Sequence, residues 1–180
     1  MKGVIFNEFL DYVERDFDAG IADRLAADGN DHYESGANYD DRRLPALLDQ
    51  TAALTGVPAS ELLCRFGTRL FGRFAALYPV FVADADSAIA FLSKIDTFVH
   101  GELNKLYADV RFPVFVCRQL ERGDLEMTYH SDRHLADLAE GLLRGCIAHF
   151  AEAIDVRRED LAPVDAKQVV RFTLVTARTE

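Results

Sequence analysis

The 180-residue chain is short of the features that mark several common classes of protein. Its three cysteines, Cys64, Cys117 and Cys146, are too few and too scattered for a disulfide framework or a cysteine-based metal site. No segment approaches the roughly 20 apolar residues of a membrane span, and the apolar run at the N-terminus is too short for a signal peptide. The sequence therefore predicts a reduced, cytoplasmic protein that does not enter a membrane.

Positive charge is also scarce, because 20 lysines and arginines face 30 acidic residues and the formal net charge is −10. A nucleic-acid-binding protein needs clustered cations to neutralise phosphates, and no such cluster is present. The chain has no tryptophan but contains 13 phenylalanines and six tyrosines. These rings suit either an ordinary core or a pocket for a flat apolar ligand. With 49% apolar residues, the length favours one globular domain.

The spacing of apolar residues predicts a run of helices followed by strands. The predicted helices cover residues 4–15, 19–27, 45–55, 60–77, 84–107 and 133–150. The predicted strands cover residues 112–120, 125–129, 154–156 and 168–176, the first two forming a hairpin. Between the second and third helices, the acidic stretch 28–41 is expected to be a solvated loop. This order predicts an α+β fold with a four-stranded antiparallel sheet.

The long helix predicted at 84–107 carries His100 on or beside its apolar stripe. A histidine that faces an apolar interior has two common explanations. Its ring nitrogens are satisfied by local hydrogen bonds, or a neutral imidazole coordinates a metal or haem iron. Taken alone, this helix favours the first explanation.

A second candidate site follows the predicted hairpin, where Tyr129, Ser131 and Arg133 occupy alternate positions. Alternate side chains of an extended segment share a face, so a phenol, a hydroxyl and a guanidinium converge beside the start of the next helix. Such donors suit one or two carboxylates. The alternative is a strand end in which Ser131 caps the helix and Arg133 lies on the surface.

An iron ligand and a carboxylate-binding motif in one small protein together point to haem. Together with other motifs, these two features make the sequence resemble the H-NOX (haem nitric oxide/oxygen binding) family over essentially its whole length. The resemblance rests on the opening Met1-Lys2-Gly3-Val4-Ile5, on Leu77-Tyr78-Pro79, on His100 with Asn104-Lys105-Leu106-Tyr107, on Pro113, and on the motif Tyr129-x-Ser131-x-Arg133.

The resemblance implies a role for each matching residue. His100 would be the proximal ligand of a haem b iron, and Pro113 would press against the porphyrin. On the opposite, distal side of the haem, Ile5 and Phe9 would pack against the ring. The propionates would be held by Tyr129, Ser131 and Arg133.

The resemblance also implies an architecture, in which one domain spans residues 1–180 and the haem lies between two lobes. A distal helical lobe would cover about residues 1–60, and a proximal lobe with the histidine helix and the sheet would cover 61–180. Binding of NO would break the bond between iron and His100 and shift one lobe against the other. The signal would pass to a separate protein, often a sensor histidine kinase or a cyclic-di-GMP enzyme, and no catalysis by the chain itself is expected.

Ligand selectivity is predicted from one departure from the family pattern. Relatives that bind O2 stably place a tyrosine five residues after the arginine of the motif, where this chain has Leu138. Without that donor, the ferrous haem is expected to bind NO and CO and to exclude O2. Tyr12 is a candidate replacement donor, although its position is expected to be off the Ile5/Phe9 face. The alternatives are an O2 sensor, a haem enzyme of the NO dioxygenase or peroxidase type, and a haem-free binder of apolar ligands.

Overall fold

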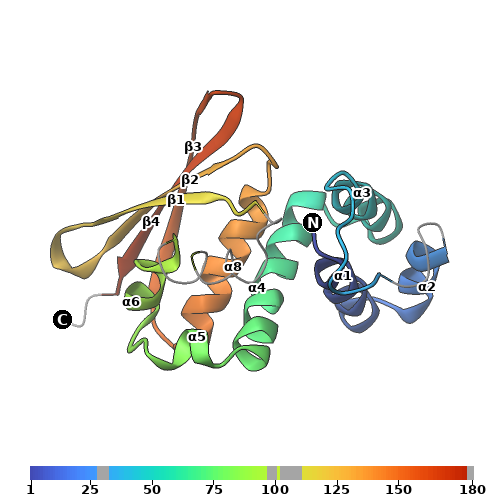
Figure 1. Cartoon of the computed structure of the whole chain (residues 1–180), viewed down its shortest axis with the longest axis horizontal. Coiled ribbons are helices and arrows are strands. Elements are labelled where there is room, and N and C mark those ends of the chain that lie inside the picture. Colours follow the sequence, from blue (N-terminus) through green and yellow to red (C-terminus); the bar gives the residue numbers. More distant parts are fainter. Residues whose placement is uncertain (28–32, 97–100, 102–110, 178–180) are drawn as a thin grey trace.

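A computed structural model describes residues 1–27, 33–96, 101 and 111–177 of the chain. Its helices and strands form a mixed fold, with the N-terminal helices at one side and a sheet at the other (Figure 1). The helices are α1 (Gly3–Asp16), α2 (Ala19–Ala27), α3 (Arg43–Thr55), α4 (Ala59–Leu77), α5 (Val80–Ala83), α6 (Ala88–Leu92) and α8 (Ala136–His149). The strands are β1 (Val114–Gln119), β2 (Leu125–Ser131), β3 (Ile154–Val164) and β4 (Lys167–Thr176).

The strands form one antiparallel sheet in the order β1-β2-β4-β3. Side chains of β2 alternate strictly, so that Leu125, Met127, Tyr129 and Ser131 are buried while the residues between them are partly exposed. Across the sheet, Tyr129 lies between Phe115 of β1 and Val170 of β4. The predicted α+β class with a four-stranded antiparallel sheet is confirmed.

Buried apolar residues form two clusters, one under the sheet and one among the N-terminal helices. Helix α4 contributes to both, because Leu62 to Leu70 belong to the helical cluster and Phe71 and Ala75 to the sheet cluster. In Figure 1, α4 and α8 lie side by side between the sheet and helices α1 to α3. The two lobes therefore share α4, and a division near residue 60 stays a prediction.

The contact between α4 and α8 is close because glycines lie at the crossing. The Cα atom of Gly67 in α4 lies 2.9 Å from the position that a Cβ of Gly141 in α8 would take. A Cβ at Gly67 would lie 2.5 Å from the carbonyl oxygen of Leu138. The backbones of the two helices thus touch, and this crossing joins the two clusters.

Three predicted elements differ from the structure by three residues or more at one end. The helix expected at 84–107 is interrupted, because α6 ends at Leu92 and the Ser93 hydroxyl donates a hydrogen bond to the Ala90 carbonyl at 3.0 Å. Of the rest of that prediction, residues 97–100, which include His100, and 102–107 lie outside the described residues. Helix α8 begins three residues later than predicted, because His134 adopts a positive φ of 54° just before it.

The third difference is strand β3, which is much longer than the predicted 154–156. Its middle residues, Arg157 to Asp160, are all charged, so apolar alternation does not reveal it. Two of these charges are paired by other parts of the chain: Arg158 with acids of α8, and Glu159 with Arg171 of β4. Partners distant in sequence therefore stabilise a strand that local hydrophobicity does not predict.

Candidate cofactor-binding site

Tyr129 is placed by β2 with its side chain under the sheet, where it is 1% exposed. Its ring packs against Phe115 with centroids 5.6 Å apart, and its hydroxyl accepts the Leu135 N–H at 3.3 Å. Burial raises the pKa of Tyr129, while the Ser131 hydroxyl and the Leu135 N–H act in the opposite direction. The phenol therefore stays protonated at neutral pH and can donate a hydrogen bond.

Ser131 and Arg133 continue this group of donors at the end of β2. The Ser131 Oγ is buried and accepts the Arg133 N–H at 3.2 Å, which turns the chain out of the sheet. The Arg133 Nη1 then donates to the Arg111 carbonyl at 2.8 Å. Since α8 begins at Ala136, Ser131 is not its N-cap, and the alternative explanation of the motif does not hold for this residue.

Arg133 also meets a carboxylate from the helical side of the molecule. Its Nε lies 2.7 Å from Oδ2 of Asp41, the second residue before α3, and the other oxygen of Asp41 lies 2.6 Å from the Met1 amino group. A cavity of about 560 Å³ opens there, lined by Met1, by Asn38 to Arg42, and by Pro45, Arg111, Asp132 and Arg133. Asp41, in the loop predicted to be solvated at 28–41, is thus only partly solvated: its side chain is 40% exposed, and cations distant in sequence bind its carboxylate.

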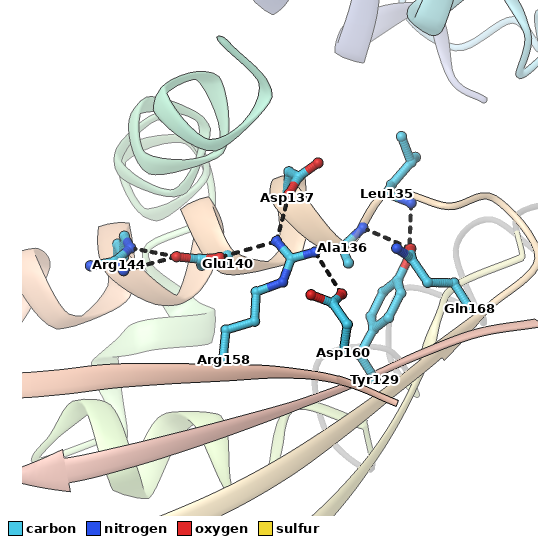
Figure 2. Close-up of polar contacts among 9 residues, drawn as sticks. All are labelled: Tyr129, Leu135, Ala136, Asp137, Glu140, Arg144, Arg158, Asp160 and Gln168. Carbon is cyan, nitrogen blue, oxygen red and sulfur yellow. Dashed lines mark hydrogen bonds and ion pairs between the residues drawn. The ribbon is translucent and has the colours of Figure 1, made fainter. Parts of the chain in front are cut away.

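The start of α8 is bonded to the sheet as well. The Ala136 N–H donates to Oε1 of Gln168 in β4 at 3.3 Å, next to the bond between Leu135 and Tyr129 (Figure 2). Gln168 was not predicted as a site residue, and its sequence context as the first predicted residue of a strand gives no signal. Two N–H groups at the start of α8, a position expected to favour an anion, therefore already donate hydrogen bonds to protein side chains.

The residues assigned to the distal side lie together in the helical cluster. Phe9 is fully buried there, and Ile5 and Leu138 pack against the cluster while partly buried. Tyr12 belongs to the same cluster, with its ring 6.0 Å from that of Phe9. Its expected position off the Ile5/Phe9 face is therefore wrong, since a spacing of three residues keeps Tyr12 on the face of Phe9.

The Tyr12 hydroxyl is buried without a hydrogen-bond partner among the described residues. Burial, reinforced by the negative charge of Asp16, raises the pKa of Tyr12 from 10.0 to about 12. Above pH 10 the unfolded chain loses this proton before the folded protein does. Stability contributed by Tyr12 is therefore present below pH 10 and is lost as the pH rises toward 12.

Between pH 10 and 12 the unfolding free energy of the wild type should fall, in part because of Tyr12. We expect the fall in Tyr12→Phe to be smaller by about 2 kcal/mol. At pH 8 the variant should equal or exceed the wild type, because an unpaired buried hydroxyl is removed. Urea unfolding at both pH values measures this. Tyr39→Phe is the control: its hydroxyl accepts the Glu34 N–H at 2.9 Å, so its loss should destabilise by about 1 kcal/mol at pH 8. Equal pH profiles for wild type and Tyr12→Phe would contradict the expectation.

Of the remaining predicted residues, Pro113 is partly buried immediately before β1, and His100 lies outside the described residues. The described geometry thus brings together Tyr129, Ser131 and Arg133 at one place and Ile5, Phe9 and Leu138 at another. A protein with these features presents a carboxylate-binding arginine, Arg133, at a cavity, two buried hydroxyls close to that arginine in the chain, and an apolar cluster in its helical half. That combination is typical of a protein that binds an amphipathic cofactor.

Comparison with known proteins gives the class a name. The model of the Haem-NO-binding family matches residues 2–158. The chain therefore belongs to the haem-NO-binding (H-NOX) family of haem-binding gas sensors, as the sequence motifs predicted.

Solved H-NOX structures share the whole fold. The unliganded Fe(II) H-NOX protein of K. algicida is 28% identical, with coverage of 99% of this chain and 98% of that one and a TM-score of 0.89. The S. oneidensis H-NOX protein in its Fe(II)NO state is 24% identical, with coverage of 99% and 100% and a TM-score of 0.89. An I5F mutant of T. tengcongensis H-NOX is 20% identical, with coverage of 99% and 98% and a TM-score of 0.91. No curated protein matches the chain.

The described residues fit haem. The Arg133 guanidinium already pairs with a carboxylate, that of Asp41, and it borders the cavity, so propionates suit its charge and hydrogen-bonding geometry. The Tyr129 and Ser131 hydroxyls lie beside it, and the helical cluster supplies an apolar surface. Within the described ranges, no helix is both long and apolar enough to cross a bilayer.

Proposed function

We propose that this protein is a cytoplasmic sensor that binds NO and CO at ferrous haem b, excludes O2, and signals without catalysing a reaction. The observation that supports the proposal is the apolar character of the residues assigned to the distal side of the haem. Ile5, Phe9 and Leu138 are apolar and lie on one cluster, so none of them donates a hydrogen bond to a bound gas. Stable O2 binding depends on such a donor far more than NO or CO binding does.

Different residues of the chain would hold different parts of the haem. His100 would supply the axial imidazole, Pro113 would press on the ring, and Tyr129, Ser131 and Arg133 would hold the propionates. Bound haem would supply a ferrous iron with one position open to a diatomic gas. Tyr129 is suited to its role because its buried phenol stays protonated and donates, whereas Arg133 supplies the positive charge.

Signalling would use the two lobes, taken as about residues 1–60 and 61–180 of one domain. When NO binds, His100 would release the iron, and the helical lobe would shift relative to the sheet. The ion pair between Asp41 and Arg133 supports such a route, because it joins the helical side to the propionate site directly. A two-state shift of this kind changes the surface offered to a partner, for which a sensor histidine kinase or a cyclic-di-GMP enzyme is the proposed class.

The test is an absorption spectrum of the reduced, haem-loaded protein without oxygen, then in air, then with NO or CO. We expect the haem band to shift with NO and with CO and to stay unchanged during brief exposure to air. A stable change in air would refute the exclusion of O2. Failure of the purified protein to take up haemin would refute haem binding itself.

A second candidate, O2 sensing, is favoured by one observation: the buried Tyr12 hydroxyl has no hydrogen-bond partner in the described part of the chain and lies in the cluster that holds Phe9. If the wild type forms a stable complex in air, Tyr12→Phe distinguishes the source of the donor. Loss of that complex in the variant would assign the donor to Tyr12. Retention would place it elsewhere.

A further inference from the structure

The first turn of α8 is anchored to three strands by three successive residues, Leu135–Asp137 (Figure 2). The Leu135 N–H donates to the hydroxyl of Tyr129 in β2 at 3.3 Å. The Ala136 N–H donates to Oε1 of Gln168 in β4, also at 3.3 Å. The Nη1 of Arg158 in β3 lies 2.5 Å from the carboxylate of Asp137. Only the last of these anchors is an ion pair between side chains.

Arg158 holds more than one carboxylate. Its Nη1 also lies 3.3 Å from Glu140, one turn further along α8, and its Nη2 lies 2.9 Å from Asp160 on its own strand. Arg144 pairs with Glu140 from the other side at 2.8 Å. The Arg158 side chain is only 25% exposed, so solvent screens these contacts less than it screens a surface pair. Without Arg158, three carboxylates would face one another across the gap between helix and sheet.

The next residue of α8, Leu138, packs against the helical cluster instead of the sheet. The glycine crossing holds α8 against α4 at Gly141 and at the Leu138 carbonyl. The anchors to the sheet hold the start of the same helix, so the crossing and the anchors together set the rotation of the first turn about the helix axis. That rotation decides where the Leu138 side chain points.

We propose that Arg158 is a positioning residue, which fixes the first turn of α8 so that Leu138 is held at the gas-binding side and links the sheet to the helical lobe. This inference rests on the proposed function in so far as Leu138 faces the gas. Arg158 itself contacts neither haem nor ligand in this role. It acts through the carboxylates of Asp137 and Glu140.

The test compares Arg158→Met with Arg158→Lys and with a matched control, Arg157→Met. Arg157 is the preceding residue of β3, and its side chain is 68% exposed. Among the described residues, its one ion pair is with Asp155, at 3.1 Å. Two readouts are needed: hydrogen–deuterium exchange of the amides of α8 and α1, and the C–O stretching frequency of the reduced, haem-loaded protein with CO. The thermal midpoint of every variant is measured alongside them.

We expect Arg158→Met to speed exchange in the first two turns of α8 by about fivefold or more, with little change in α1, and to shift the C–O frequency. Arg158→Lys should return part of both effects, because the ammonium restores the charge without the fork of the guanidinium. Arg157→Met should leave both readouts at wild-type values.

Two results would overturn the inference. One is a uniform rise in exchange across α1 and α8 with an unchanged C–O frequency, which would reduce Arg158 to general structural support. The other is an equal effect of Arg157→Met. If the wild type took up no haem, the proposed function would fall, and the local exchange pattern in α8 alone would decide whether Arg158 positions the helix.

Discussion

Replacing Gly141 by alanine is expected to lower the free energy of unfolding by about 3 kcal/mol, a large part of the stability of a small domain. A Cβ at this position would lie far inside contact distance of the Cys64 carbonyl oxygen and 2.9 Å from the Gly67 Cα. Both obstacles are backbone atoms of α4, so neither can move away by rotating a side chain. The helices would have to separate, and the packing of both apolar clusters would loosen with them.

A matched control is available on the other helix of the same pair. Gly72 of α4 is exposed, and a Cβ there would meet nothing within 4 Å. Gly72→Ala should therefore stabilise the protein by about 0.5–1 kcal/mol, because alanine is the better helix former. Urea unfolding of both variants measures the difference. A Gly141→Ala variant as stable as the wild type would show that α4 and α8 do not meet as closely as described.

Local signals in the sequence are sufficient for most helices of this fold. Helix α2 covers the predicted residues 19–27, because its apolar residues recur at regular helical spacing. Helix α4 ends at Leu77, as predicted, because the residue before Pro79 is disfavoured in the helical conformation. The family motifs add the candidate site, since Tyr129, Ser131 and Arg133 are recognisable by type and spacing alone.

What sequence reasoning misses is set by contacts between distant segments. Asp41 looks like one of several solvated acids until Arg133 is placed beside it. Strand β3 is hidden by its charged residues, among them Arg158, whose partners lie on α8, and Glu159, whose partner lies on β4. The sequence interpretation puts Tyr12 off the Ile5/Phe9 face, because no local signal shows which residues of α1 are covered by α4. In the structure its ring lies 6.0 Å from that of Phe9.

Leu138→Tyr is the second substitution with a large expected effect, a gain of stable O2 binding in a protein proposed to exclude it. Leu138 is partly buried against the helical cluster. The family resemblance implies that it takes the position at which members that bind O2 stably have a tyrosine. A phenol there would donate a hydrogen bond to the polar bound oxygen. A hydrogen bond to a partly charged acceptor is worth about 1.5–3 kcal/mol, or roughly a tenfold to hundredfold gain in O2 affinity.

Leu138→Phe separates the hydroxyl from the ring, because it adds nearly the same volume without a donor. We expect its reduced, haem-loaded form to stay unchanged in air, whereas Leu138→Tyr should give a stable oxygen complex in the absorption spectrum. NO binding should persist in both variants, because NO depends little on the donor. A stable oxygen complex in Leu138→Phe would mean that pocket volume, and not the missing hydroxyl, governs exclusion. With no complex in either variant, the proposed selectivity would need a cause other than the residue at position 138.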